Sequence, residues 1–168
     1  MIEEHWVTIA IMARDEEDSI TELVGACKPY GDETMVMDGH STDDTRAKAL
    51  QAGARVEVDG GRGKGEAVRR VADLATGDII VFIDADGSHE PSDIPKLIDP
   101  IAHGAADLVI ASRPRGGSDE MSGDLAKVIR TIGSHFITLA INYRFGVRLT
   151  ESQNGFRAIR HHSVCPPG

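Results

Sequence analysis

An apolar run at residues 79–83 follows Gly77-Asp78 and ends abruptly in Asp84-Ala85-Asp86. The run is too short for a helix and rich in β-branched residues, which predicts a strand buried on both faces, as in the middle of a parallel sheet. Ligands bind at the carboxyl ends of such strands. Two acids two positions apart can point to the same side there, and they repel each other unless a cation lies between them. The pattern therefore predicts either a site for Mg²⁺ or Mn²⁺, which favour oxygen ligands, or a simple turn cap.

Strand patterns alternate with helical patterns along most of the chain. Besides residues 79–83, strands are predicted at residues 7–13, 33–38, 55–58 and 107–112. A helical pattern follows each of these five strands except the last one in the sequence. This alternation predicts an α/β fold with a mainly parallel central sheet and helices on both faces. A length of 168 residues predicts one domain with a proper core.

The composition excludes several classes of protein. With 27 acids against 18 bases, the chain is not expected to bind nucleic acid. Cys27 and Cys165 form neither a disulfide framework nor a zinc spacing, which fits a reducing compartment. There is no apolar segment typical of a signal peptide after Met1 and no apolar run of membrane-spanning length. We therefore expect a cytoplasmic location.

A second chemical signal is the loop at residues 59–65, where four glycines accompany Arg62 and Lys64 just before a helix. Backbone N–H groups at a helix N-terminus, together with nearby bases, suit a phosphate. The loop lacks the Gly-Lys-Ser/Thr of a Walker P-loop, and it also fits a flexible surface segment. Asp38 ends another predicted strand, where an acid either binds a ribose or orders the loop that follows.

After residue 112 the pattern changes to a basic, glycine-rich segment and then a long helical pattern. Lys127, Arg130, Arg144 and Arg148 lie on this pattern or near its end. They fit an ordinary core-facing helix with solvated bases, or a cationic surface near an anionic membrane.

Taken in order, the motifs of this chain resemble those of the family-2 glycosyltransferases, most of all the dolichol-phosphate mannose synthase and polyprenyl-phosphate glycosyltransferase branch. The motifs are Asp15-Glu16, Asp38-Gly-His-Ser-Thr-Asp43-Asp-Thr45, Gly63-Lys64-Gly65, Asp84-Ala85-Asp86-Gly-Ser-His-x-Pro91, Ser112-Arg113 and Asn154-Gly155-Phe156-Arg157. The resemblance implies a GT-A, Rossmann-like fold. It divides the single domain, 1–168, into a nucleotide-sugar-binding half, 1–112, and an acceptor-side half, 113–168, which we expect to be truncated.

The resemblance also implies roles for particular residues. The residues expected to bind the nucleotide sugar are Met12, Arg14, Glu16, Asp38, Lys64, Asp84 and Ala85. The expected ligands of Mg²⁺ or Mn²⁺ are Asp84, Asp86 and Ser88, and the expected catalytic residues are Asp86, Arg113 and Glu151. Met12 and Arg14 stand where relatives usually carry a proline and an aromatic residue, so the choice between a GDP-sugar and a UDP-sugar stays open.

The activity implied is an inverting transfer of a hexose, mannose or glucose, from a nucleoside-diphosphate sugar. The first acceptor is a polyprenyl or dolichyl phosphate, which brings with it peripheral contact with the cytoplasmic face of a membrane. The alternatives are a soluble hydroxyl acceptor, for which Glu151 would be the base, and a nucleotide-sugar-binding module without activity. A homo-oligomer is compatible with each of these.

Overall fold

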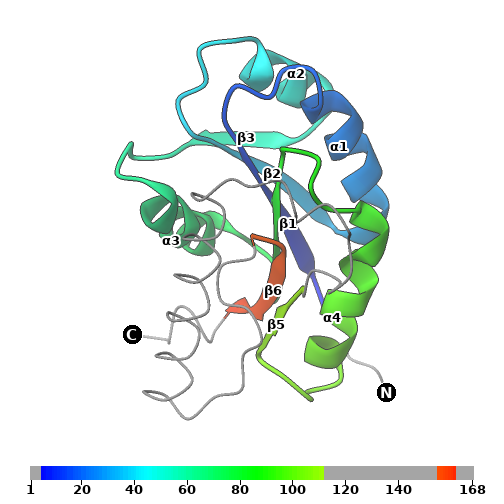
Figure 1. The fold of residues 1–168 in the computed structure, drawn as a ribbon. Coiled ribbons are helices and arrows are strands. Elements are labelled where there is room, and N and C mark those ends of the chain that lie inside the picture. The colour runs from blue at the N-terminus through cyan, green and yellow to red at the C-terminus, as the bar shows by residue number, and fades with distance from the viewer. Residues whose placement is uncertain (1–4, 112–154, 162–168) are drawn as a thin grey trace, which may run out of the picture. The chain divides into compact units, whose positions relative to one another are not determined.

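The computed structural model describes residues 5–111 and 155–161, which form a sheet of six strands in the order β3-β2-β1-β4-β6-β5 (Figure 1). The strands are β1 (Val7–Ala13), β2 (Glu33–Asp38), β3 (Arg55–Val58), β4 (Ile79–Asp84), β5 (Leu108–Ile110) and β6 (Arg157–Arg160). β1 pairs in parallel with β2 and β4, and β2 in parallel with β3. β6 pairs antiparallel with β4. The mainly parallel α/β sheet predicted from the sequence is confirmed.

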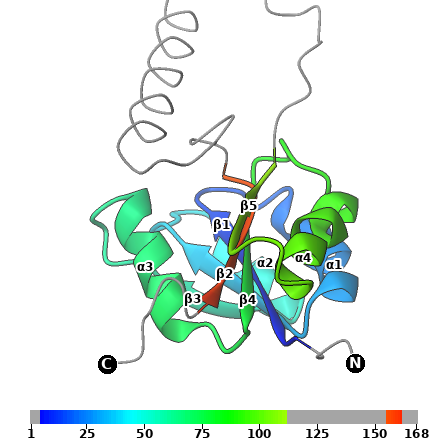
Figure 2. The same ribbon diagram turned by 90° about the horizontal axis from the view of Figure 1, so that it is seen from below.

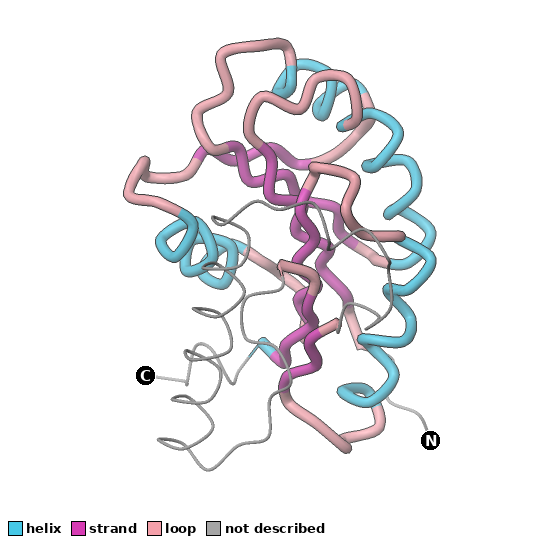
Figure 3. Tube along the Cα trace, in the orientation of Figure 1, coloured by secondary structure: helices cyan, strands magenta, loops and turns pink. Residues whose placement is uncertain are grey.

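Four α-helices follow the first four strands. They are α1 (Ile20–Cys27), α2 (Thr45–Gln51), α3 (Lys64–Leu74) and α4 (Ile94–Ala102), with 3-10 turns at η1 (Lys28–Tyr30) and η2 (Pro91–Asp93). Figure 2 shows α3 on one face of the sheet and α1 and α4 on the other, and the tube in Figure 3 shows the loops that join them to the strands. Helices therefore cover both faces, as the strand–helix alternation predicts.

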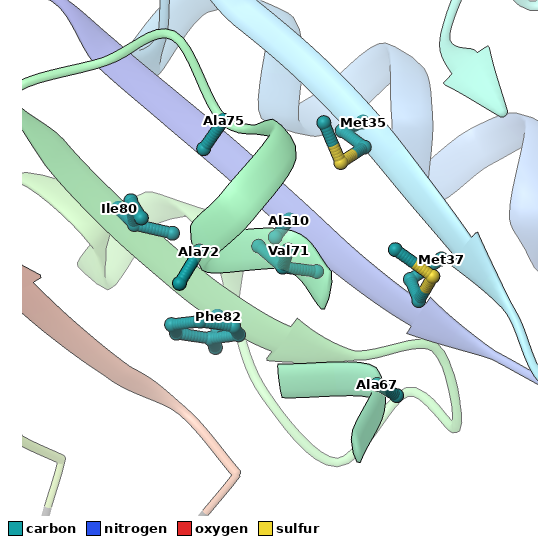
Figure 4. Packing of buried hydrophobic residues seen from close by; sticks show 9 residues of the cluster. All are labelled: Ala10, Met35, Met37, Ala67, Val71, Ala72, Ala75, Ile80 and Phe82. Atoms are coloured by element: carbon teal, nitrogen blue, oxygen red, sulfur yellow. The ribbon is translucent and has the colours of Figure 1, made fainter. Parts of the chain in front are cut away.

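α3 lies close to the sheet because most of the side chains that it turns toward the sheet are small (Figure 4). The strands contribute Ala10, Met35, Met37, Ile80 and Phe82, and the other side of the contact is formed by Ala67, Val71, Ala72 and Ala75. Burying a side chain of the size of Ile80 stabilises the fold by about 1.5–3 kcal/mol. This packing fixes where the N-terminus of α3 lies relative to the ends of the strands.

The sequence did not predict β6. Its residues lie in a stretch with no clear strand pattern, and only pairing with β4 makes them a strand. β6 also lies between β4 and β5, so these two strands, which are consecutive in the sequence, are not neighbours in the sheet. The segment of residues 155–161 thus contributes to the same sheet as the N-terminal strands. In the sequence, the 43 residues 112–154 separate it from the first described range.

Candidate active site

A cleft of about 810 Å³ opens at the carboxyl ends of β1, β2 and β4, beside the N-terminus of α3. Its volume is in the range of small-molecule sites. The sequence-predicted residues that line it are Met12, Arg14, Glu16, Lys64, Asp84, Ala85 and Asp86. Residues from three strand ends and one helix start therefore meet at the edge of the sheet where ligands bind in open α/β folds.

Asp84 and Lys64 form an ion pair in the lining of this cleft. Asp84 is the last residue of β4, and Lys64 is the first residue of α3. The Lys64 ammonium lies 2.7 Å from Oδ1 and 2.9 Å from Oδ2 of Asp84, so it donates to both carboxylate oxygens. The helix starts directly after Gly63, which has a φ of +92°, a backbone conformation that glycine adopts without steric cost. A positively charged group of the protein itself, the ammonium of Lys64, is thus bound to Asp84.

Asp86 lies in the turn that follows β4 and is exposed. Its Oδ1 accepts a hydrogen bond of 3.0 Å from the backbone N–H of Ser88, across Gly87, whose φ is +72°. Hydrogen bonding by the Ser88 side chain lowers the pKa of Asp86; burial raises it, and the Ser88 backbone and the nearby positive groups lower it further. The net effect keeps Asp86 ionised at neutral pH. Ser88, predicted as a metal ligand, lies next to this carboxylate.

The two carboxylates suit a hard divalent ion. The described residues contain no group of three or more His, Cys, Asp or Glu side chains that would form a complete metal cage. Two acidic ligands are nevertheless the usual protein share for Mg²⁺, which completes its coordination with water and substrate phosphates. The oxygen donors and the ammonium already bound at Asp84 both indicate that the residues fit a divalent ion paired with a diphosphate.

The opposite side of the cleft is built from the loops after β1 and β2. Asp15, with a φ of +54°, donates its backbone N–H to Oγ of Ser41 at 2.9 Å, and its Oδ1 accepts the backbone N–H of Thr42 at 2.7 Å. The backbone N–H of Glu16 bonds Oγ1 of Thr45 at 2.8 Å. These bonds join the two loops, so the side chains of Arg14 and Glu16 reach the cleft from a fixed backbone.

His40 and Asp59 also line the cleft and were not predicted as site residues. Nε2 of His40 lies 3.1 Å from the backbone oxygen and 3.2 Å from Oδ1 of Asp59. His40 has a φ of +62°, which turns its side chain toward the loop that follows β3. Their position in the sequence was the available signal: Asp59 directly follows a predicted strand and His40 comes two residues after another, where site residues gather.

Asp38 lies behind the lining of the cleft rather than in it. Its side chain is fully buried, and its carboxylate accepts the backbone N–H of Ser41 at 3.1 Å and 3.3 Å. Nε of Arg46, in α2, lies 3.5 Å from Oδ2. In this structure Asp38 orders the loop between β2 and α2, which was the second role that the sequence allowed. Its contact with a nucleotide stays a prediction, as do the roles of Arg113 and Glu151, which lie outside the described residues.

The family model for glycosyl transferase family 2 matches residues 8–164. The chain belongs to this family. It is 33% identical to glycosyltransferase AglJ of Haloferax volcanii, over 94% of this chain and 51% of that protein. It is 35% identical to glucosyl-3-phosphoglycerate synthase of Mycobacterium tuberculosis, over 70% of this chain and 41% of that protein. The chain thus spans about half the length of the curated relatives it matches.

Solved structures of the family share this fold. One is glucosyl-3-phosphoglycerate synthase of M. tuberculosis in complex with Mn²⁺, UDP-glucose and phosphoglyceric acid. The match has a TM-score of 0.73 and 28% identity, and it covers 94% of this chain and 57% of that one. The predicted family and GT-A-type fold are confirmed, and the Mn²⁺ in that complex supports the divalent metal cofactor. The narrower resemblance to dolichol-phosphate mannose synthases stays a prediction, because the relatives above carry other names.

Among the helices formed by residues 5–111 and 155–161, none is both long and apolar enough to cross a bilayer. Contact with a membrane surface and the location in the cell stay predictions.

Proposed function

We propose that this chain is the donor-binding part of a metal-dependent inverting hexosyltransferase, with UDP-glucose as the first candidate donor. The observation that carries the proposal is the meeting of Lys64, Asp84 and Asp86 in one cleft at the carboxyl edge of the sheet. An ammonium, two carboxylates and a helix N-terminus form a surface suited to a diphosphate with a divalent ion. The named complex of the mycobacterial relative supports UDP-glucose over a GDP-sugar.

In the proposed complex, Asp84 and Asp86 would hold the divalent ion, and Lys64 would leave Asp84 to donate to a phosphate oxygen. The bound ion would stabilise the negative charge that develops on the departing diphosphate. The ammonium of Lys64 adds to this stabilisation from a fixed helix start. Arg14, Glu16 and His40 lie on the other side of the cleft, where the nucleoside would bind.

The bond between the anomeric carbon of the hexose and the β-phosphate oxygen breaks, and its electron pair leaves with the diphosphate. A new bond forms from the acceptor oxygen to the opposite face of the same carbon. For a hydroxyl acceptor a base must take the proton, and Glu151 is the candidate. A phosphorylated hydroxy acid is the first acceptor to test, because both a relative by sequence and a solved structure with the same fold are glucosyl-3-phosphoglycerate synthases.

A polyprenyl phosphate is the second acceptor, and the ordered set of motifs that resembles the polyprenyl-phosphate branch favours it. Its phosphate oxygen is already an anion, so this acceptor needs no general base. The two acceptors therefore differ in whether Glu151 is required.

The donor is tested by thermal shift with UDP-glucose, UDP-galactose and GDP-mannose, each with and without Mn²⁺. We expect the largest stabilisation with UDP-glucose and Mn²⁺ together, because a ligand at a hundredfold excess over its dissociation constant adds about 2.7 kcal/mol. The Asp86→Asn variant should lose the part of the shift that needs Mn²⁺. An equal shift for all donors, or one that does not depend on Mn²⁺, contradicts the proposal.

The acceptor is tested with UDP-glucose labelled in the sugar. Label in an anionic water-soluble product after incubation with 3-phosphoglycerate supports the hydroxyl acceptor. Label extracted into organic solvent after incubation with a polyprenyl phosphate supports the lipid acceptor. Binding of UDP-glucose without transfer to either one would instead indicate a nucleotide-sugar-binding module.

A further inference from the structure

The backbone of Gly155 lies directly against the carboxylate of Asp84. A Cβ placed on Gly155 would overlap Oδ2 of Asp84, and it would lie 2.6 Å from Cγ and 3.0 Å from Oδ1 of the same side chain. Contacts this short cannot exist, so any side chain at position 155 would force Asp84 to turn away. Lys64 bonds the same carboxylate. The carboxylate of this predicted metal ligand is therefore confined from two sides, by an ammonium that a bound phosphate would draw away and by a glycine backbone that stays in place.

The two residues after Gly155 also pack near the segment of residues 82–89, which contains Asp84 and Asp86. Phe156 is 2% exposed, and its ring stacks on His89 with 5.0 Å between the ring centroids. Arg157 pairs with Phe82 in the ladder between β4 and β6, and its guanidinium lies 5.2 Å from the centre of the Phe82 ring. Gly155 and Phe156 thus contact the loop of residues 84–89 at its two ends, and Arg157 contacts the strand that precedes it.

We propose that Gly155 is a positioning residue for the metal site, and that residues 155–157, which lead into β6, hold the loop of Asp84 and Asp86 in its binding conformation. The proposal rests on the proposed function of this cleft. Its consequence is that residues 1–112 do not complete the donor site by themselves. A segment that returns after residue 154 supplies the surface against which Asp84 is oriented.

The test measures Mn²⁺ binding by electron paramagnetic resonance at saturating UDP, together with UDP binding without metal. For Gly155→Ala we expect Mn²⁺ affinity to fall about tenfold or more, in the range seen when groups that orient metal ligands are removed. UDP affinity without metal should change less than twofold, because the nucleoside side of the cleft is built from other loops. A merely structural role would lower the melting temperature without this difference between the two ligands.

Two glycines serve as matched controls. Gly25 is exposed in α1, and a Cβ there meets no atom within 4 Å, so Gly25→Ala should leave both affinities unchanged. Gly31 lies near the amino end of the sheet, and its Cβ would be 2.8 Å from Cδ1 of Ile9. Gly31→Ala should therefore lower the melting temperature while the folded protein keeps its Mn²⁺ affinity.

If Gly155→Ala does not fold, His89→Ala decides, because it removes the ring that stacks on Phe156 without adding bulk to the sheet. We expect it to weaken Mn²⁺ binding severalfold. A folded Gly155→Ala with the Mn²⁺ affinity of the wild type overturns the positioning role, and so does an unchanged His89→Ala if Gly155→Ala is unfolded. A wild-type chain that binds UDP but no Mn²⁺ overturns the metal-dependent function itself, which is a distinguishable result.

Discussion

β2 and β4 flank β1 on either side, and each of them ends in an aspartate. Asp38 lies opposite Ala13 in the parallel ladder, whereas Asp84 lies opposite Met12. Neighbouring residues in a strand point to opposite faces, so this offset of one position sends the two carboxylates to opposite sides of the sheet. Asp38 is buried on the face that carries α2, and Asp84 faces α3 and the cleft.

The partners of Asp38 and Asp84 differ as well: the one that bonds Asp38 is fixed within the fold, whereas the partner of Asp84 is an exposed side chain. Asp38 bonds a backbone N–H in its own loop and lies beside Arg46. Asp84 is bonded by Lys64, a long side chain that is 58% exposed. A carboxylate bonded to fixed backbone groups stabilises the fold, whereas one bonded to a mobile ammonium can exchange that partner for another cation. We therefore expect the register of each strand, rather than the acid at its end, to decide whether that acid orders a loop or binds a ligand in the cleft.

The largest effect is expected when the acid on the cleft side is changed. Asp84→Asn should reduce Mn²⁺-dependent UDP binding and turnover by about a hundredfold, because a neutral amide is a poor ligand for a divalent ion. Its melting temperature should stay close to that of the wild type. Titration of UDP with and without Mn²⁺ measures the effect, and an unchanged Mn²⁺ dependence would rule out this ligand.

The acid on the buried side should behave in the opposite manner. Asp38→Ala leaves the backbone N–H of Ser41 without its partner, which costs about 1–3 kcal/mol of the free energy of unfolding. Urea unfolding measures this loss, and Mn²⁺ affinity of the folded protein should stay unchanged. A tenfold loss of UDP affinity with full stability would instead show that Asp38 binds the nucleotide directly.

Lys64→Gln tests the exchange of cations at Asp84. Mn²⁺ without nucleotide should bind about fivefold more tightly, because the competing ammonium is gone; an ion pair this exposed contributes roughly 1 kcal/mol or less. UDP should bind more weakly, because a phosphate loses its cation. Isothermal titration measures both changes. Lys96→Gln, which removes a lysine bonded to Asp93 in an exposed pair, is the control and should change neither affinity.

The smallest effect is expected at Glu33, an acid with fixed partners at the amino end of the sheet. Burial by itself raises the pKa of Glu33, but hydrogen bonds from Thr8, Thr76 and Arg55 together lower it below its ordinary value. Because the pKa is depressed in the folded state, this contribution to stability is present above about pH 4.3 and is lost as the pH falls further. Glu33→Gln should therefore lose less stability than the wild type between pH 6 and pH 3, as measured by urea unfolding.

Much of the fold could be predicted from the residues. The strand patterns gave β1 to β4 nearly to their ends, and helical spacing gave the helices that follow them. β6 could not be predicted, because its four residues become a strand only through pairing with β4. Of the site, Lys64, Asp84 and Asp86 were found because each follows a strand or begins a helix. His40 and Asp59 were missed, because a position after a predicted strand does not by itself show that these two residues meet.

The sequence by itself determined the alternation of strands and helices and placed acids and a basic glycine-rich loop at the carboxyl edge of the sheet. Both follow from local preferences, which short segments carry on their own. Only the tertiary structure decided that Asp38 is buried while Asp84 faces the cleft, and that Gly155 lies against Asp84. Register and the return of a distant segment arise from pairing between strands far apart in the chain, and no local pattern encodes such contacts.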